Sequence, residues 1–192
     1  MEEEKPKLYF FDKVFALTFL RLIPRSVKPN HLTVFRFLTV PFVVILLWGE
    51  HYWWGMAFFL VSALSDALDG AMARVRDQIT TWGKIYDPLA DKLLICSAVV
   101  ILVMRWVDFY AALIIVGLEI LMIAIAIFKK WRGIVEIQAN VWGKIKMVLQ
   151  VVGVVVLLVS LVFNLETLLP ASRGVFYLAI AFAIVSLFTY SL

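Results

Sequence analysis

Residues 61–94 read VSALSDALDGAMARVRDQITTWGKIYDPLADKLL, and they decide the fold because two pairs of aspartates interrupt strongly apolar sequence. Asp66 and Asp69 are three positions apart, and Asp87 and Asp91 are four positions apart. On helices these spacings place each pair on one face, with neighbouring Cβ atoms about 5–6 Å apart. An aspartate at the centre of a membrane-spanning helix costs about 2.5–3.5 kcal/mol, so the four carboxylates require compensating charge and indicate a functional site.

A pair of divalent cations is the compensation that we infer for these carboxylates. The stretch contains no cysteine or histidine, and oxygen ligands suit hard ions such as Mg²⁺ or Mn²⁺, which bind carboxylates together with substrate phosphates. Two ions roughly 4 Å apart would form the clamp that is used to displace one phosphate oxygen by another. The expected metal ligands are Asp66, Asp69, Asp87 and Asp91.

Small residues accompany the aspartates. Gly70 and Ala73 continue the helix of the first pair without bulky side chains, and Gly83 precedes Asp87 by about one turn. Such positions let a substrate approach the backbone closely. Close packing between helices is the alternative explanation for these small residues.

The composition is that of a membrane protein. The chain has 192 residues, of which 64% are hydrophobic, against roughly 45–50% in a soluble domain. We therefore expect an all-α integral membrane protein with one domain over 1–192, whose six-helix bundle occupies 31–191. The acidic, mixed start of the chain argues against a cleaved signal peptide. The six expected membrane-spanning helices, each about 20 residues long, are 31–49, 53–75, 83–104, 109–128, 139–163 and 172–191.

Residues 8–25 precede this bundle and read LYFFDKVFALTFLRLIPR. Aromatic residues and leucines recur at steps of three and four, with charged residues between them, and this pattern predicts an amphipathic helix that lies in the cytoplasmic interface of the membrane. Pro24 is expected to end the helix.

The basic residues predict the orientation. Of the 18 lysines and arginines, 16 fall on one side of the expected spans, and only Arg105 and Arg173 fall on the other. The positive-inside rule then places both termini and the aspartates on the cytoplasmic side, in what we expect to be a prokaryotic cytoplasmic membrane. A basic face suits anionic membrane lipids. No nucleic-acid partner is expected, because no soluble domain is predicted to present a basic patch.

The aspartate motif reads DxxDGxxAR, eight residues, then GxxxDxxxD, and it resembles the signature of the CDP-alcohol phosphatidyltransferase family. Two further elements resemble parts of that family: NxxTxxR at Asn30, Thr33 and Arg36, and GKxKxxxQ at 143–150, which is typical of the phosphatidylglycerophosphate synthase branch. The residues that carry the main motif are Asp66, Asp69, Gly70, Ala73, Arg74, Gly83, Asp87 and Asp91.

The resemblance implies an enzyme that uses two divalent cations to transfer the phosphatidyl group of CDP-diacylglycerol to a small alcohol, with release of CMP. It favours glycerol 3-phosphate as the acceptor, which gives phosphatidylglycerophosphate, and it suggests a homodimer. Asp91 is expected to be the base that takes the proton of the acceptor hydroxyl. The residues expected at CDP and its pyrophosphate are Thr33, Asp69, Gly70, Ala73, Arg74 and Gly83. Those expected at the acceptor phosphate are Arg36, Lys144 and Lys146.

Some residue roles stay open. Arg74 either contacts the pyrophosphate or orients an aspartate through an ion pair. Arg36, Lys144 and Lys146 have an alternative role, in which they extend to lipid headgroups. Glu119, near the middle of the fourth expected span, is either protonated or paired across the bundle.

Other functions also stay open. Within the same chemistry, the acceptor is alternatively inositol phosphate, serine or phosphatidylglycerol, the last of which gives cardiolipin. A different class of protein, an ion or proton-coupled transporter, would use the acids as an ion path. That hypothesis needs a further polar route toward the outer face, and apart from Glu119 the sequence supplies none.

Overall fold

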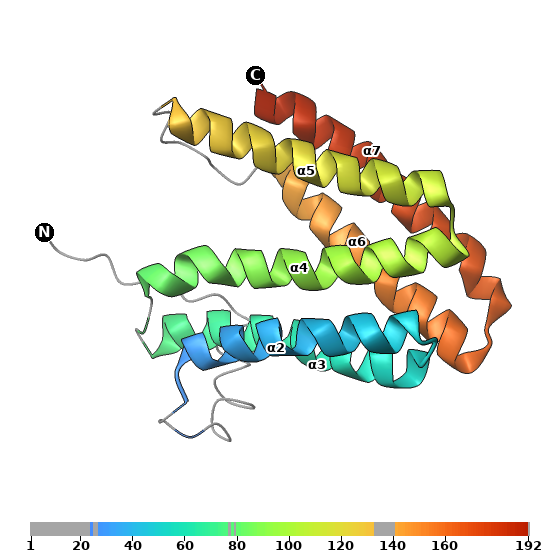
Figure 1. The fold of residues 1–192 in the computed structure, drawn as a ribbon, viewed down its shortest axis with the longest axis horizontal. Coiled ribbons are helices and arrows are strands. Elements are labelled where there is room, and N and C mark those ends of the chain that lie inside the picture. Colours follow the sequence, from blue (N-terminus) through green and yellow to red (C-terminus); the bar gives the residue numbers. More distant parts are fainter. Residues whose placement is uncertain (1–23, 25–26, 77, 79, 133–140, 192) are drawn as a thin grey trace, which may run out of the picture. The chain divides into compact units, whose positions relative to one another are not determined.

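The computed structural model describes residues 24, 27–76, 78, 80–132 and 141–191. These residues form six α-helices and one short 3-10 turn, and none of them lies in a β-strand, which confirms the all-α prediction for this part of the chain (Figure 1). The predicted interfacial helix, 8–25, lies outside the described residues except for Pro24. The elements are α2 (Pro29–Trp48), α3 (Tyr52–Val75), α4 (Thr81–Trp106), α5 (Phe109–Trp131), α6 (Val141–Phe163), η1 (Glu166–Leu168) and α7 (Leu169–Ser191).

Five helices, α2, α3, α5, α6 and α7, are long and apolar enough to cross a membrane, which fits a multi-pass membrane protein. The helix bounds agree with the six segments predicted from the sequence to within three residues at each end. Helix α4 is the exception in composition, because it carries Asp87, Asp91 and Lys92 in its first half and Arg105 in its last turn. Its passage through the membrane, and hence the count of six spans, stays a prediction.

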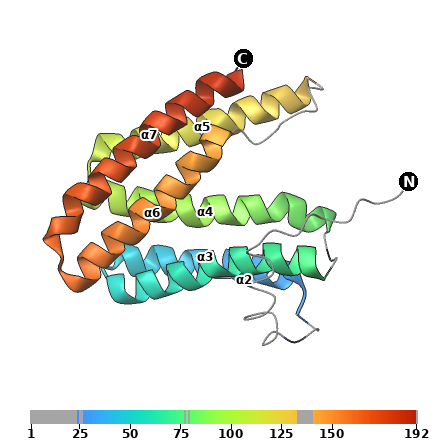
Figure 2. The same cartoon turned by 180° about the vertical axis from the view of Figure 1, so that it is seen from behind.

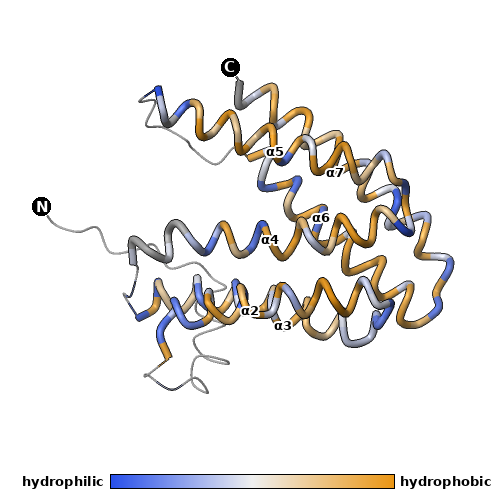
Figure 3. The backbone as a smooth tube through the Cα atoms, viewed as in Figure 1, coloured by the Kyte–Doolittle hydropathy of each residue, from blue (hydrophilic) through white to orange (hydrophobic). Residues whose placement is uncertain are grey.

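Figure 3 shows how polarity is distributed along the helices. Long middle stretches of the described helices are hydrophobic, while most hydrophilic residues lie near helix ends and in the connecting turns. A helix in a bilayer satisfies its own backbone groups, so the apolar middle carries no solvation cost there. The polar residues within the helices are therefore the positions that require an explanation.

The described chain divides into two compact units. The first unit contains α2 up to Leu46, α3 from Ala57 and α4 up to Leu94, and therefore all four aspartates of the motif. The second unit contains the turn between α2 and α3 together with the described residues from Ile95 onward.

In the first unit, α2 and α3 lie side by side (Figures 1 and 2). The hydroxyl groups of Thr39 and Ser62 are 2.8 Å apart and share a buried hydrogen bond. The rings of Phe42 and Phe58 stack with their centroids 6.0 Å apart. Small and hydroxyl-bearing residues let membrane helices approach each other, and the hydrogen bond between them adds about 0.6 kcal/mol.

In the second unit, α6 packs most extensively against α7, and α5 also packs against α7. Gly153 permits the close approach of α6 and α7, because a Cβ atom there would lie 2.9 Å from the ring of Phe176. Asn164 ends α6 with a positive φ of 54°, and the next amide, of Leu165, donates to the carbonyl oxygen of Ser160 at 2.9 Å. This is the left-handed helix stop that glycine or asparagine usually supplies.

Candidate functional site

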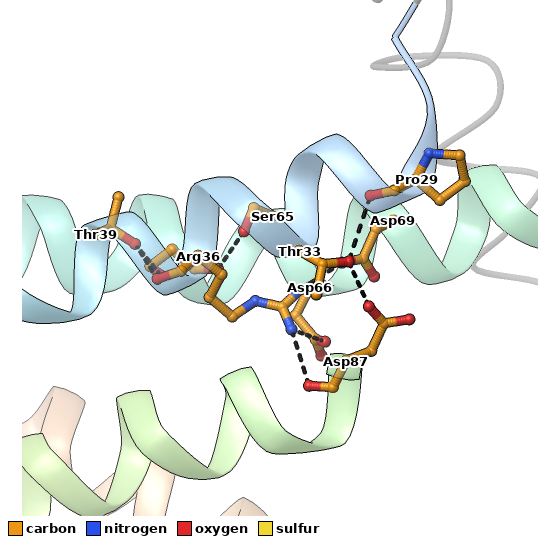
Figure 4. Close-up of polar contacts among 9 residues, drawn as sticks. Pro29, Thr33, Arg36, Thr39, Ser65, Asp66, Asp69 and Asp87 are labelled. Atoms are coloured by element: carbon orange, nitrogen blue, oxygen red, sulfur yellow. Dashed lines mark hydrogen bonds and ion pairs between the residues drawn. The ribbon is translucent and has the colours of Figure 1, made fainter. Parts of the chain in front are cut away.

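The polar residues of the first unit converge at the ends of three helices (Figure 4). Helix α3 supplies Asp66 and Asp69, α4 supplies Asp87, and α2 supplies Thr33 and Arg36. The spacing of three residues puts both α3 carboxylates on one face of the helix, as the sequence predicted. The structure adds that both carboxylates on this face contact Arg36 of α2.

Arg36 is the centre of this arrangement, and its side chain is completely buried. Its Nη1 lies 2.7 Å from Asp66 Oδ1, and its Nη2 lies 2.5 Å from Asp69 Oδ2. Nη1 also donates to the backbone carbonyl oxygen of Asp87 at 3.4 Å. One guanidinium therefore connects α2 to both other helices. The two carboxylates differ in access, because Asp69 is 3% exposed whereas Asp66 is 43% exposed.

Thr33 lies one turn before Arg36 on α2 and is fully buried. Its hydroxyl group donates a short hydrogen bond to Asp87 Oδ1. This contact holds one oxygen of the α4 carboxylate. The Pro29 carbonyl oxygen, 3.5 Å from the same hydroxyl group, is a more distant acceptor for its single proton.

A second hydroxyl, of Thr80, lies where α4 begins. Its Oγ1 accepts a hydrogen bond from the Gly83 amide at 2.9 Å and donates one to Asn30 Oδ1 at 2.9 Å. A Cβ atom at Gly83 would lie 3.1 Å from both Asp87 Oδ2 and Thr80 Oγ1, so the glycine leaves room for both groups. Thr80 was not among the site residues predicted from the sequence, although a threonine just before an expected helix is a standard capping signal.

Gly70, Ala73 and Arg74 follow the α3 aspartates. The guanidinium of Arg74 folds back over Gly70, because a Cβ atom at that glycine would lie 3.4 Å from Arg74 Nη1. Ala73 and Arg74 are half-buried. The absence of a side chain at Gly70 thus makes space for an arginine beside the carboxylates.

Asp91 lies one turn after Asp87 on α4 and is half-buried. Within the described ranges, no hydrogen bond or ion pair engages its carboxylate. The same part of the chain holds no group of three or more histidine, cysteine, aspartate or glutamate side chains close enough to share a metal ion. Arg36 explains in part why the carboxylates are not closer together, because its guanidinium lies between Asp66 and Asp69.

Two residues predicted at the acceptor phosphate, Lys144 and Lys146, belong to α6 in the second unit. Lys146 is buried and forms a short ion pair with Glu119 of α5, and the Gln150 amide donates to the same Glu119 oxygen at 3.4 Å. Of the two possibilities left open for Glu119, the structure therefore shows a carboxylate paired with a neighbouring helix. Lys144 is exposed.

The donor set of the first unit fits a hard cation with phosphate ligands. Its candidate ligand atoms are carboxylate oxygens, which Mg²⁺ and Mn²⁺ prefer. The partly exposed Asp66 offers an approach to these oxygens, and the buried Arg36 already shows that two of them accept a compensating positive charge. Buried Arg36 Nε has no hydrogen-bond partner among the described atoms, so the guanidinium has capacity for one more acceptor.

The model of the CDP-alcohol phosphatidyltransferase family matches residues 26–187. The chain is 29% identical to CDP-diacylglycerol--glycerol-3-phosphate 3-phosphatidyltransferase 2 of Arabidopsis thaliana, over 84% of this chain and 77% of that protein. Two proteins named CDP-diacylglycerol--glycerol-3-phosphate 3-phosphatidyltransferase are also similar. The one from Pseudomonas fluorescens is 33% identical over 69% of this chain and 72% of its own length. The one from Bacillus subtilis (strain 168) is 29% identical over 82% of this chain and 90% of its own length.

Proposed function

The chain belongs to the CDP-alcohol phosphatidyltransferase family, and from this membership we propose that it transfers the phosphatidyl group of CDP-diacylglycerol to glycerol 3-phosphate. The products are phosphatidylglycerophosphate and CMP. The names of the relatives from Arabidopsis thaliana, Pseudomonas fluorescens and Bacillus subtilis support this choice of acceptor. The single observation that carries the proposal is the meeting of Asp66, Asp69 and Asp87 around Arg36 at the ends of three helices.

Two divalent cations, Mg²⁺ or Mn²⁺, complete the proposed site, with ligands from Asp66, Asp69, Asp87 and Asp91. When bound, such ions neutralise phosphate oxygens and the charge that develops on the leaving group. The protein positions the ligands before any ion arrives: Thr33 holds one oxygen of Asp87, and Arg36 holds one oxygen each of Asp66 and Asp69.

The cytidine diphosphate part of the substrate is proposed to lie along the small residues of the motif. Gly70, Ala73 and Gly83 place no bulky side chain of their own beside the carboxylates. Arg74, which folds over Gly70, is within reach of a phosphate there, and a guanidinium is well suited to bind phosphate oxygens. Thr33 and Asp69 complete the proposed set for CDP.

Asp91 is proposed as the general base. It takes the proton of the acceptor hydroxyl while that oxygen bonds to the phosphorus of the phosphatidyl group and the bond from phosphorus to the CMP oxygen breaks. Within the described residues the Asp91 carboxylate makes no hydrogen bond or ion pair, which supports this role, since the base should be the carboxylate that is least committed to other partners.

Arg36, Lys144 and Lys146 are proposed to provide positive charge for the phosphate of the acceptor. The three side chains differ in burial and in ion pairing, and hence in how accessible they are to a substrate. Arg36 and Lys146 are buried in ion pairs with aspartates and with Glu119, respectively, whereas Lys144 is exposed on the first turn of α6. Lys144 is therefore the member that is best able to meet an incoming phosphate directly.

We propose the remaining architecture on the sequence pattern. The chain forms one catalytic domain over 1–192. Helix α4 crosses the membrane in addition to the five apolar helices, and residues 8–25 form an interfacial helix. Both termini and the aspartates face the cytoplasm, since 16 of the 18 basic residues fall on that side. A homodimer in the membrane is the proposed assembly.

CMP release tests the proposed function. Purified protein is given CDP-diacylglycerol, Mg²⁺ or Mn²⁺, and one of four acceptors: glycerol 3-phosphate, inositol phosphate, serine or phosphatidylglycerol. We expect CMP release to depend on the divalent ion, to be fastest with glycerol 3-phosphate and to be lost in Asp91→Asn. A faster reaction with another acceptor would overturn the substrate assignment. No release with any acceptor, together with ion flux in liposomes, would instead support the transporter hypothesis.

A further inference from the structure

We infer that Thr80 is a positioning residue whose hydroxyl group sets where α4 begins against α2 and thereby fixes the Asp87 carboxylate. Thr80 lies among the eight residues between Arg74 and Gly83, for which the sequence motif specifies no residue type. The inference rests on the proposed function, because that proposal gives Asp87 its role.

The Thr80 hydroxyl uses its donor and an acceptor site at the same time. It accepts from the Gly83 amide at 2.9 Å, which caps the first turn of α4, and it donates to Asn30 Oδ1 at 2.9 Å. The same atom therefore caps the start of α4 and connects it to Asn30 in the first turn of α2.

A parallel contact lies one turn further along both helices. Thr33 follows Asn30 by three residues on α2, and Asp87 follows Gly83 by four residues on α4. The Thr33 hydroxyl donates to Asp87 Oδ1. Two side-chain bridges at successive turns fix both the position of α4 along α2 and its rotation, which one bridge alone would leave free.

Gly83 connects the two bridges. A Cβ atom there would lie 3.1 Å from Asp87 Oδ2 and equally 3.1 Å from Thr80 Oγ1. Asp87 thus has Thr33 on one oxygen, and the other oxygen lies beside the backbone that Thr80 caps. Loss of the Thr80 hydroxyl releases that backbone, while Thr33 and Arg36 still hold α4 to α2. The effect should therefore fall on cation binding more than on folding.

The size of the effect follows from the bond. A hydrogen bond within a protein is worth about 0.5–1.5 kcal/mol net, which corresponds to a factor of about 2–12 in a binding constant. We expect Thr80→Val, which keeps the shape and removes the hydroxyl group, to weaken Mn²⁺ binding by such a factor. Thr80→Ser keeps the hydroxyl group and should bind Mn²⁺ as the unaltered protein does.

The experiment measures Mn²⁺ binding by electron paramagnetic resonance titration of the full chain in detergent, without substrate. Thr189→Val is the matched control, because the Thr189 hydroxyl bonds to carbonyl groups of its own helix, α7. Asn30→Ala removes the other half of the bridge. Because Thr80→Val and Asn30→Ala break the same contact, the free energy of Mn²⁺ binding lost in the double variant should be smaller than the sum of the losses in the two single variants. Asn30→Ala alone serves if Thr80→Val does not fold.

Unchanged Mn²⁺ binding in Thr80→Val, or equal loss in Thr80→Val and Thr80→Ser, would overturn the inference. Amide hydrogen exchange separates this outcome from a failure of the proposed function. If the unaltered protein binds no Mn²⁺, the proposed cation site fails. Hydrogen exchange then tests the inference about Thr80. We expect the Gly83 amide to exchange at least twofold faster in Thr80→Val than in Thr189→Val, and equal exchange rates would overturn the inference.

Discussion

Arg36 Nη2 lies 2.5 Å from Asp69 Oδ2, with neither side chain more than 3% exposed. Together with the contact to Asp66, this pair places a permanent positive charge of α2 between the two α3 carboxylates. It answers the question that the sequence raises, namely how acids persist in a bundle of apolar helices. Arg36 pairs with two of the four aspartates, but its single positive charge offsets only one negative charge, and the remaining negative charge is available to cations.

Replacement of Arg36 by methionine should destabilise the protein strongly in the absence of divalent ions. Removal of one partner from a buried ion pair costs about 3–5 kcal/mol, because the other partner is left buried and charged. Thermal unfolding in detergent measures the loss. Mn²⁺ should restore part of the stability, since an ion that binds only the folded state stabilises it.

Arg105→Met is the control for this substitution. Arg105 pairs with Glu50 at 3.1 Å, but the two side chains are 33% and 66% exposed, and an exposed pair contributes only about 0–1 kcal/mol. Equal unfolding temperatures for Arg36→Met and Arg105→Met would show that Arg36 does not carry the charge compensation assigned to it.

Gly83→Ala should weaken Mn²⁺ binding with little loss of stability. The new methyl group would lie 3.1 Å from Asp87 Oδ2, so the carboxylate must shift by a few tenths of an ångström. Changes next to metal ligands typically cost about 10–100-fold in metal affinity or activity. Gly117→Ala is the control in α5, because a Cβ atom there would meet no atom of the described residues within 4 Å. The account is contradicted if both variants bind Mn²⁺ equally well.

Lys146→Met should destabilise the protein, and Glu119→Leu added to it should restore most of the loss. The single change leaves Glu119 buried without its ammonium partner, whereas apolar residues at both positions remove the charge altogether. Thermal unfolding of both variants tests the pair. A double variant that is no more stable than Lys146→Met would argue that Lys146 is held by something other than Glu119.

Lys144→Gln should raise the KM for glycerol 3-phosphate by about tenfold, the equivalent of roughly 1.4 kcal/mol. The KM for CDP-diacylglycerol serves as the internal control and should stay unchanged, because the exposed Lys144 is assigned to the acceptor alone. Initial rates of CMP release at varied concentrations of each substrate give both values. A rise only in the KM for CDP-diacylglycerol would show that Lys144 acts on that substrate instead of on the acceptor.

Local sequence patterns predicted most of the fold. Apolar runs of membrane-spanning length gave helix bounds within three residues of those observed. The spacing of Asp66 and Asp69 placed them correctly on one face of α3, because that relationship is set by helix geometry within a single element. The interfacial helix and the sixth membrane span stay predictions.

Contacts between distant segments were harder to predict. Lys146 and Glu119 are 27 positions apart in the sequence and lie on different helices, and no periodicity within either helix identifies the partner. Arg36 is similar. The resemblance predicted a phosphate partner for it, but its burial between Asp66 and Asp69 depends on how α2 packs against α3. Thr80 carries a local capping signal, yet its bond to Asn30 arises only when α4 meets α2.

The most direct test of the central claim is anomalous X-ray diffraction from crystals of the protein grown with Mn²⁺. The account predicts two anomalous peaks within bonding distance of carboxylate oxygens of Asp66, Asp69, Asp87 and Asp91. The account is contradicted by crystals in which Arg36 still bridges Asp66 and Asp69 but no anomalous peak lies at the four aspartates, if Mn²⁺ also fails to support CMP release in solution.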